Sequence, residues 1–205
     1  KVEVVGDTNE NGTTVKFKPD CDIFSARSFD SLILKERMRA IAFLNPGIKL
    51  TLVDARSTEE ESSVFYSEKG IIDMVDMLRG ERESVSRPIL INREMDSVKV
   101  NVALQYVKSY SEELLSFVNN VKTTEGGTHV IGFHAALSRA IIGYIQKNTK
   151  KPTQIEGEDA REGLIAIISV LMPSPEFEGQ TKEKLGSQSI RNIVDSVVYQ
   201  ELNKF

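Results

Sequence analysis

The 205-residue sequence holds one cysteine, Cys21, no tryptophan and only two histidines. A single cysteine can form neither an internal disulfide nor a cysteine-based metal site, and such scarcity is typical of a protein kept in the reducing cytoplasm. His129 and His134 are five residues apart, whereas two metal ligands on one helix face are spaced i, i+4. The sequence therefore predicts no metal site.

Long apolar runs are also missing. No segment reaches the ~18 to 20 apolar residues that a membrane-spanning helix needs, and the first residues lack the basic-then-apolar order of a signal peptide. We therefore expect no contact with a membrane. The sequence starts without a methionine and stops within a helical pattern, so we expect both ends to be cut from a longer polypeptide.

Basic residues do not outnumber acidic ones, and the formal net charge is −4. This balance argues against a domain whose whole surface binds nucleic acid. Residues 126–155 nevertheless contain no acidic residue. Contact with DNA phosphates is one role for the basic side chains of this stretch, and an exposed helix face beside a polar loop explains them equally well. These side chains are Arg139, Lys147, Lys150 and Lys151.

The apolar residues that are present follow the patterns of strands. A continuous apolar run at 164–172 suits a central strand covered on both faces. Period-2 alternation or short β-rich runs predict further strands at 1–5, 15–17, 48–52, 63–67, 89–91, 98–106 and 114–118.

Helical periodicity is equally clear elsewhere. It predicts helices over 29–44, 71–78, 133–145 and 190–205, the last with Ser187 or Ser189 as N-cap. No repeat or Pro/Gly-rich linker divides the chain. We therefore expect one α+β domain over residues 1–186, with helices on one face of its sheet. Residues 187–205 would be its C-terminal helix, leading towards a following domain.

One loop carries residues suited to phosphate chemistry. Pro173, Pro175 and Gly179 favour a fixed loop at the exit of the buried strand, and the loop presents Gln180-Thr-Lys182. A lysine ammonium is a movable charge with three donors, which suits the oxygens of a terminal phosphate. On composition alone, a solvated surface lysine explains the pattern as well.

Two further segments have structural explanations. The pair Gly126-Gly127 before a predicted helix suits a tight turn, with an anion site at the helix N-terminus as the alternative. The acidic residues Glu158, Asp159 and Glu162 are typical of a solvated helix start rather than of a catalytic pair.

Segments spread over nearly the whole chain carry a family resemblance. They are Phe17-Lys-Pro-Asp-Cys-Asp-Ile-Phe24, Ala42-Phe-Leu-Asn45, Asp54-Ala-Arg56, Ser116-Phe-Val-Asn-Asn120, Glu125-Gly-Gly-Thr-His129 with Gly132-Phe133, Glu158-Asp-Ala-Arg-Glu-Gly-Leu164, and the loop ending Gln180-Thr-Lys182. In this order they resemble the B (ATPase) subunits of bacterial-type DNA gyrase and topoisomerase IV. This chain departs from many gyrase members at His134, where they carry arginine, which puts a DNA-facing charge there in doubt.

The resemblance implies the transducer domain, the second domain of the ATPase region. Its fold is similar to that of a small-subunit ribosomal protein and contains a left-handed β-α-β crossover, against the general rule of handedness. In that family Gln180 and Lys182 would contact the γ-phosphate of ATP, with Lys182 in a catalytic role. ATP and Mg²⁺ would be held mainly by a preceding ATPase domain, and the fragment alone would bind no cofactor and catalyse nothing.

The same resemblance implies the activity of the whole protein, an ATP-dependent type II DNA topoisomerase. Its partners would be a second B subunit in an ATP-dependent dimer, the DNA-cleaving A subunit and double-stranded DNA. Two alternatives stay open: the second domain of a mismatch-repair or chaperone ATPase, and a non-enzymatic nucleic-acid-binding module in which Lys182 is mere surface. Gln180-Thr-Lys182 favours the topoisomerase, and the net acidity weighs against the binding module.

Overall fold

The computed structural model describes residues 3, 6–7, 9, 12–25, 28–56, 61–149 and 155–205. Most of the predicted strand at 1–5 lies outside these residues. Within them the chain forms a two-stranded sheet, β1-β2, and a five-stranded sheet of order β3-β4-β7-β5-β6. The elements in chain order are α1 (Ser31–Leu44), β1 (Leu50–Asp54), β2 (Glu61–Phe65), α2 (Ile71–Arg79), β3 (Ile89–Met95), β4 (Val98–Tyr106), β5 (Glu113–Val118), β6 (Val121–Lys122), α3 (Thr128–Asn148), the 3₁₀ turn η1 (Asp159–Arg161), β7 (Leu164–Leu171) and α4 (Gln188–Leu202).

Strand β7 is the centre of the larger sheet. It pairs antiparallel with β4, where Val102 is opposite Ile168, and parallel with β5, where Ser116 is opposite Ile168. Residues Leu164 to Val170 are all buried. The continuous apolar run therefore formed a strand covered on both faces, as predicted, since a strand with no solvent side has no polar alternation.

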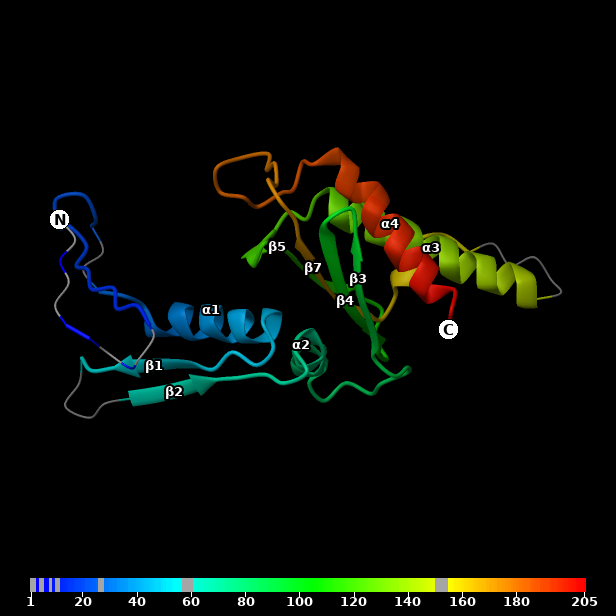
Figure 1. Ribbon diagram of the computed structural model, residues 1–205. Coiled ribbons are helices and arrows are strands. Elements are labelled where there is room, and N and C mark those ends of the chain that lie inside the picture. The colour runs from blue at the N-terminus through cyan, green and yellow to red at the C-terminus, as the bar shows by residue number, and fades with distance from the viewer. Residues whose placement is uncertain are drawn as a thin grey trace.

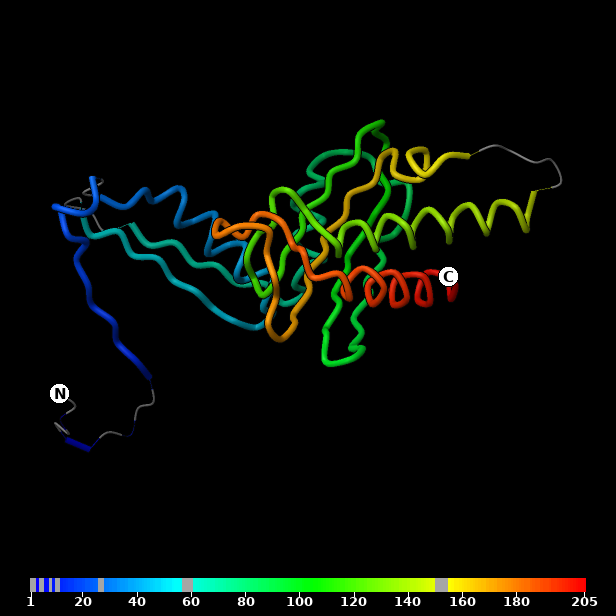
Figure 2. Tube along the Cα trace, turned by 90° about the horizontal axis from the view of Figure 1, so that it is seen from above, coloured from blue at the N-terminus to red at the C-terminus, as the bar shows by residue number. Residues whose placement is uncertain are grey.

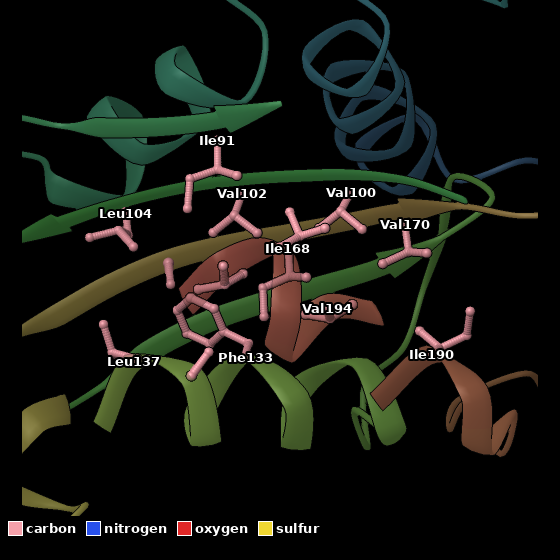
Figure 3. Packing of buried hydrophobic residues seen from close by; sticks show 14 of the residues in the cluster. Ile91, Val100, Val102, Leu104, Phe133, Leu137, Ile168, Val170, Ile190 and Val194 are labelled. Carbon is pink, nitrogen blue, oxygen red and sulfur yellow. The ribbon is translucent and has the colours of Figure 1, made fainter. Parts of the chain in front are cut away.

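Helices α3 and α4 cover one face of this sheet (Figure 1). Because strand side chains alternate between faces, the even-numbered residues of β4 and β7 point to this side. They pack on Phe133, Leu137 and Val194 in one apolar cluster (Figure 3). The strand residues are Val98, Val100, Val102, Leu104, Leu164, Ala166, Ile168 and Val170.

Helix α2 lies on the opposite face. Its Met74 and Val75 pack with Ile165, Ile167 and other odd-numbered strand residues in a second cluster. The expected α+β class is confirmed, and the two long helices share one face as expected. The short helix departs from that expectation because Ile165 and Ile167 also need an apolar cover.

The parallel neighbours β5 and β7 are joined through β6, α3 and η1, which is a β-α-β crossover. Its left-handed sense stays a prediction from the family resemblance. Helices α3 and α4 run side by side in both views (Figures 1 and 2). Gly132 allows this approach, because a Cβ there would lie 2.4 Å from the carbonyl oxygen of Arg191.

The N-terminal part extends from this core as α1 and the β1-β2 hairpin (Figure 1). Asp30 caps α1 by accepting a hydrogen bond from the Leu32 amide at 2.8 Å. The predicted strand at 15–17 is wrong, since no described strand pairs with it and Val15 and Phe17 are 79% and 72% exposed. Alternation alone cannot make a strand without a neighbouring strand edge.

Candidate functional site

The loop after β7 is a closed hairpin over residues 176–186, called here the 176–186 hairpin. The Gly186 amide donates to the Glu176 carbonyl at 2.8 Å, and the Glu178 amide donates to the Lys184 carbonyl at 3.0 Å. Phe177 and Leu185 form an antiparallel bridge between these two pairs. The segment that the sequence marked as a fixed loop is therefore held by its own backbone.

Gln180, Thr181 and Lys182 form the tip of this hairpin, and all three are exposed. The tip turns tightly, because the Lys182 amide donates to the Gly179 carbonyl at 3.1 Å and Lys182 has φ of 59°. Left-handed backbone is uncommon for a residue with a side chain and marks a constrained turn. The two predicted phosphate-binding residues, Gln180 and Lys182, thus lie together at the tip of one hydrogen-bonded hairpin.

The two lysines of the hairpin differ in their pairing. Lys184 lies 2.8 Å from the Glu178 carboxylate, and this hydrogen-bonded pair raises the pKa of Lys184. No hydrogen bond or ion pair links the side chains of Gln180 or Lys182 to any residue that the structure describes. Lys182 therefore offers three free donors, whereas the charge of Lys184 is already matched.

Behind the hairpin, the start of α3 contains a buried histidine. His129 is 0% exposed, and its Nε2 lies 3.2 Å from Thr123 Oγ1, which is 2.7 Å from Ser116 Oγ. Burial lowers the pKa of His129 to about 4. The imidazole is therefore neutral near pH 7 and belongs to the packed support of the helix start.

The other histidine, His134, belongs to a separate polar group with Glu112 and Arg161. The sequence analysis did not connect these three residues. Its Nε2 lies 2.6 Å from Glu112, whose other oxygen lies 3.4 Å from Arg161. Glu112 also contributes to raising the pKa of Tyr106 to about 12, although burial is the larger cause. Partners so far apart in sequence leave no local signal.

In the described part of the chain, no group of three or more His, Cys, Asp or Glu residues is arranged to hold a metal ion.

The two candidate DNA-facing residues that the structure describes, Arg139 and Lys147, do not lie near the hairpin. Arg139 pairs with Asp195 at 3.0 Å, and its guanidinium stacks over the Tyr199 ring at 4.0 Å, so it bridges α3 and α4. Lys147 is exposed in the last turn of α3. At 1.5 Å per residue, this turn is roughly 30 Å from the start of the helix. Lys150 and Lys151 lie outside the described residues.

The overall fold of the chain is similar to solved ATPase regions of gyrase-like proteins. The 43K ATPase domain of Thermus thermophilus gyrase B, in complex with an aminocoumarin, has a TM-score of 0.79 and 35% sequence identity, and the match covers 92% of this chain and 51% of that one. The topoisomerase IV ATP-binding domain of Francisella tularensis, in complex with a small-molecule inhibitor, has a TM-score of 0.76 and 26% identity, covering 91% and 50%.

Sequence comparison is more specific. The family profile described as DNA gyrase B matches residues 70–205, and the chain belongs to this family. It is 45% identical to the DNA gyrase B protein of Archaeoglobus fulgidus over 97% of this chain and 31% of that protein. It is also 45% identical to the DNA gyrase B protein of Campylobacter jejuni over 98% and 26%. The chain spans about a third or less of the length of these two relatives. The predicted family resemblance is confirmed, in preference to a mismatch-repair or chaperone ATPase.

Proposed function

We propose that this chain is the transducer domain of the ATPase subunit of a gyrase-like type II topoisomerase. Its 176–186 hairpin would detect the γ-phosphate of ATP and couple ATP hydrolysis to DNA strand passage. The observation that carries the proposal is the tip of the hairpin, where Lys182 and Gln180 are exposed and unpaired within the described structure while Lys184, two residues on, is paired. A surface lysine that serves only solubility does not need to be held on a tight turn of a hydrogen-bonded hairpin.

The donors at the tip fit phosphate oxygens. The Lys182 ammonium supplies a charge where negative charge develops during phosphoryl transfer, and the Gln180 amide supplies a weaker neutral donor. We assign γ-phosphate binding to both residues and the catalytic, charge-stabilising role to Lys182. Among the described residues, no acidic cluster suited to a cation lies at the tip. By the family resemblance, Mg²⁺ and most of the ATP molecule would be held by the preceding ATPase domain.

Coupling follows from the difference between the two nucleotides. ADP lacks the γ-phosphate that Lys182 would contact, so ATP and ADP favour different orientations of this domain relative to its neighbour. We further propose the remaining partners implied by the family: a second copy of the ATPase subunit, the DNA-cleaving subunit and double-stranded DNA. A cytoplasmic location is proposed on the same ground. No helix in the described part of the chain is long and apolar enough to cross a membrane.

The test is ATP turnover by the complete subunit with Lys182→Ala, using Lys184→Ala as the matched control. Loss of a donor aimed at transition-state charge lowers the rate by about 100-fold to 1,000-fold, and Gln180→Ala should have a smaller effect. Neither lysine substitution should cost more than ~0.5 kcal/mol of stability. A Lys182→Ala subunit that hydrolyses ATP within about threefold of wild type, under ~0.7 kcal/mol in barrier, would show that the proposal is wrong.

A further inference from the structure

The geometry assigns Gly127 and Thr128, at the start of α3, as positioning residues for Lys182. They touch no reacting atom themselves. They hold the 176–186 hairpin against the start of α3 and so fix the position of its tip. This inference rests on the proposed function, in which Lys182 contacts the γ-phosphate, and it adds residues that set where that contact is made.

The second strand of the hairpin lies along residues 125–128. The Glu125 amide donates to the Glu183 carbonyl at 3.0 Å, and the Leu185 amide donates to the Gly126 carbonyl at 3.0 Å. The Thr128 amide donates to the Leu185 carbonyl, also at 3.0 Å. The segment before α3 and the hairpin thus form a short ladder, on the side of the hairpin away from its first strand.

The side chain of Thr128 extends this ladder to α4. Its Oγ1 donates to the Ser187 carbonyl at 2.8 Å, and both residues are buried, with 6% and 7% of their surface exposed. Ser187 Oγ in turn accepts a hydrogen bond from the Glu176 amide at 2.9 Å, at the first strand of the hairpin. Two hydroxyls, those of Thr128 and Ser187, therefore join the base of the hairpin to the starts of both long helices.

Gly127 sets the distance between the two segments. A Cβ at this position would lie 2.4 Å from the Leu185 oxygen and 2.5 Å from the Leu185 nitrogen, and the residue has φ of 131°. These contacts are with backbone, which cannot turn aside as a side chain can. A side chain at position 127 must therefore push the hairpin away from α3.

A small tilt at the base of the hairpin becomes a larger displacement at its tip. Lys182 is three residues from Leu185, which corresponds to about 10 Å of extended chain. A tilt at Leu185 therefore displaces the Lys182 ammonium, and a misplacement of ~1 Å can cost ~100-fold in rate. The turn at the tip would stay intact, because the Lys182-to-Gly179 hydrogen bond does not involve α3.

The experiment compares Thr128→Val, Thr128→Ser and Gly127→Ala in the complete subunit, with Gly143→Ala in the same helix as control. A Cβ at position 143 meets no atom within 4 Å. We expect Thr128→Val and Gly127→Ala to lower kcat for ATP hydrolysis by at least about tenfold while the affinity for ADP stays at the wild-type value. Thr128→Ser keeps the hydroxyl and should restore most of the rate, and Gly143→Ala should match wild type. A role in folding alone would lower the unfolding temperature without this split between kcat and ADP affinity.

A double-variant cycle with Lys182→Ala decides whether the effect passes through the lysine. If Thr128 acts by placing Lys182, Thr128→Val should lower the rate no further once Lys182 is gone. Independent losses that multiply would overturn the inference, as would a wild-type kcat for both Thr128→Val and Gly127→Ala beside a disabled Lys182→Ala. A wild-type rate for Lys182→Ala itself would instead reject the proposed function. If Thr128→Val does not fold, the same cycle with Gly127→Ala gives the decision.

Discussion

Acidification should destabilise this protein through His129 before most carboxylates are protonated. The imidazole is 0% exposed, and its Nδ1 has no hydrogen-bond partner among the described residues. Protonation would bury a charge and a second N–H donor with nothing to accept from it. For this reason burial lowers the pKa of His129 from 6.5 to about 4.

The sign and size of the effect follow from proton linkage. Between pH 6.5 and about 4 the unfolded chain binds a proton at His129 that the folded chain excludes, so stability falls as the pH falls through this window. The slope approaches about 1.36 kcal/mol per pH unit. The loss reaches about 2 kcal/mol at pH 5 and about 3 kcal/mol at pH 4, and it levels off below that.

The assay is urea denaturation of this chain at pH 7.5, 6, 5 and 4, compared with His129→Gln. Glutamine has no titrating group, so the variant removes only the pH-dependent contribution of His129. We expect the wild type to lose about 2 kcal/mol more than the variant between pH 7.5 and 5. Parallel stability curves for the two proteins over this range would show that burial of neutral His129 does not make the stability depend on pH.

Three further predictions concern packing, nucleotide and DNA. Gly132→Ala should destabilise the protein by ~1 to 3 kcal/mol in thermal unfolding, because its Cβ would lie 2.4 Å from the Arg191 carbonyl oxygen and overpacking carries about this cost. Gly143→Ala should not destabilise it, because a Cβ there meets no atom within 4 Å. This chain alone should show no ATP turnover and no micromolar binding of a non-hydrolysable ATP analogue in calorimetry. A single hairpin supplies only a few hydrogen bonds of ~1.5 to 3 kcal/mol each. Micromolar binding would reject the assignment of this chain as the transducer domain. Its binding to a short DNA duplex should be weak and should fall steeply between low and physiological salt; salt-independent binding would support a nucleic-acid-binding module instead.

The core could be predicted from the sequence where the apolar pattern was strong. The runs at 98–106 and 164–172 became β4 and β7, and the helical pattern around Phe133 became part of α3. Periodicity reports which side chains are covered but not by what, so it did not place α2 on the second face. The alternation at Val15 and Phe17 had no neighbouring strand within the described structure, and there the same rule failed.

The candidate site shows the same division. Gln180 and Lys182 could be predicted as donors on a fixed loop. Prolines and a glycine favour a turn, and a lysine supplies donors, whatever the rest of the chain does. The residues that support the tip were not, since the hydrogen bonds from Thr128 to Ser187 and from Glu125 to Glu183 join segments more than fifty residues apart. Arg139 was assigned by its charge alone, and the structure shows it paired with Asp195.

γ-Phosphate recognition by Lys182 is tested most directly by the affinity of the complete subunit for two nucleotides, with and without this lysine. A non-hydrolysable ATP analogue and ADP are titrated into the wild type and Lys182→Ala under the same conditions. One charge-assisted bond is worth ~1.5 to 3 kcal/mol, so we expect the variant to bind the analogue about 10-fold to 150-fold more weakly and to bind ADP as the wild type does. Equal affinity of both proteins for the analogue, or an equal loss for both nucleotides, would contradict γ-phosphate recognition by Lys182.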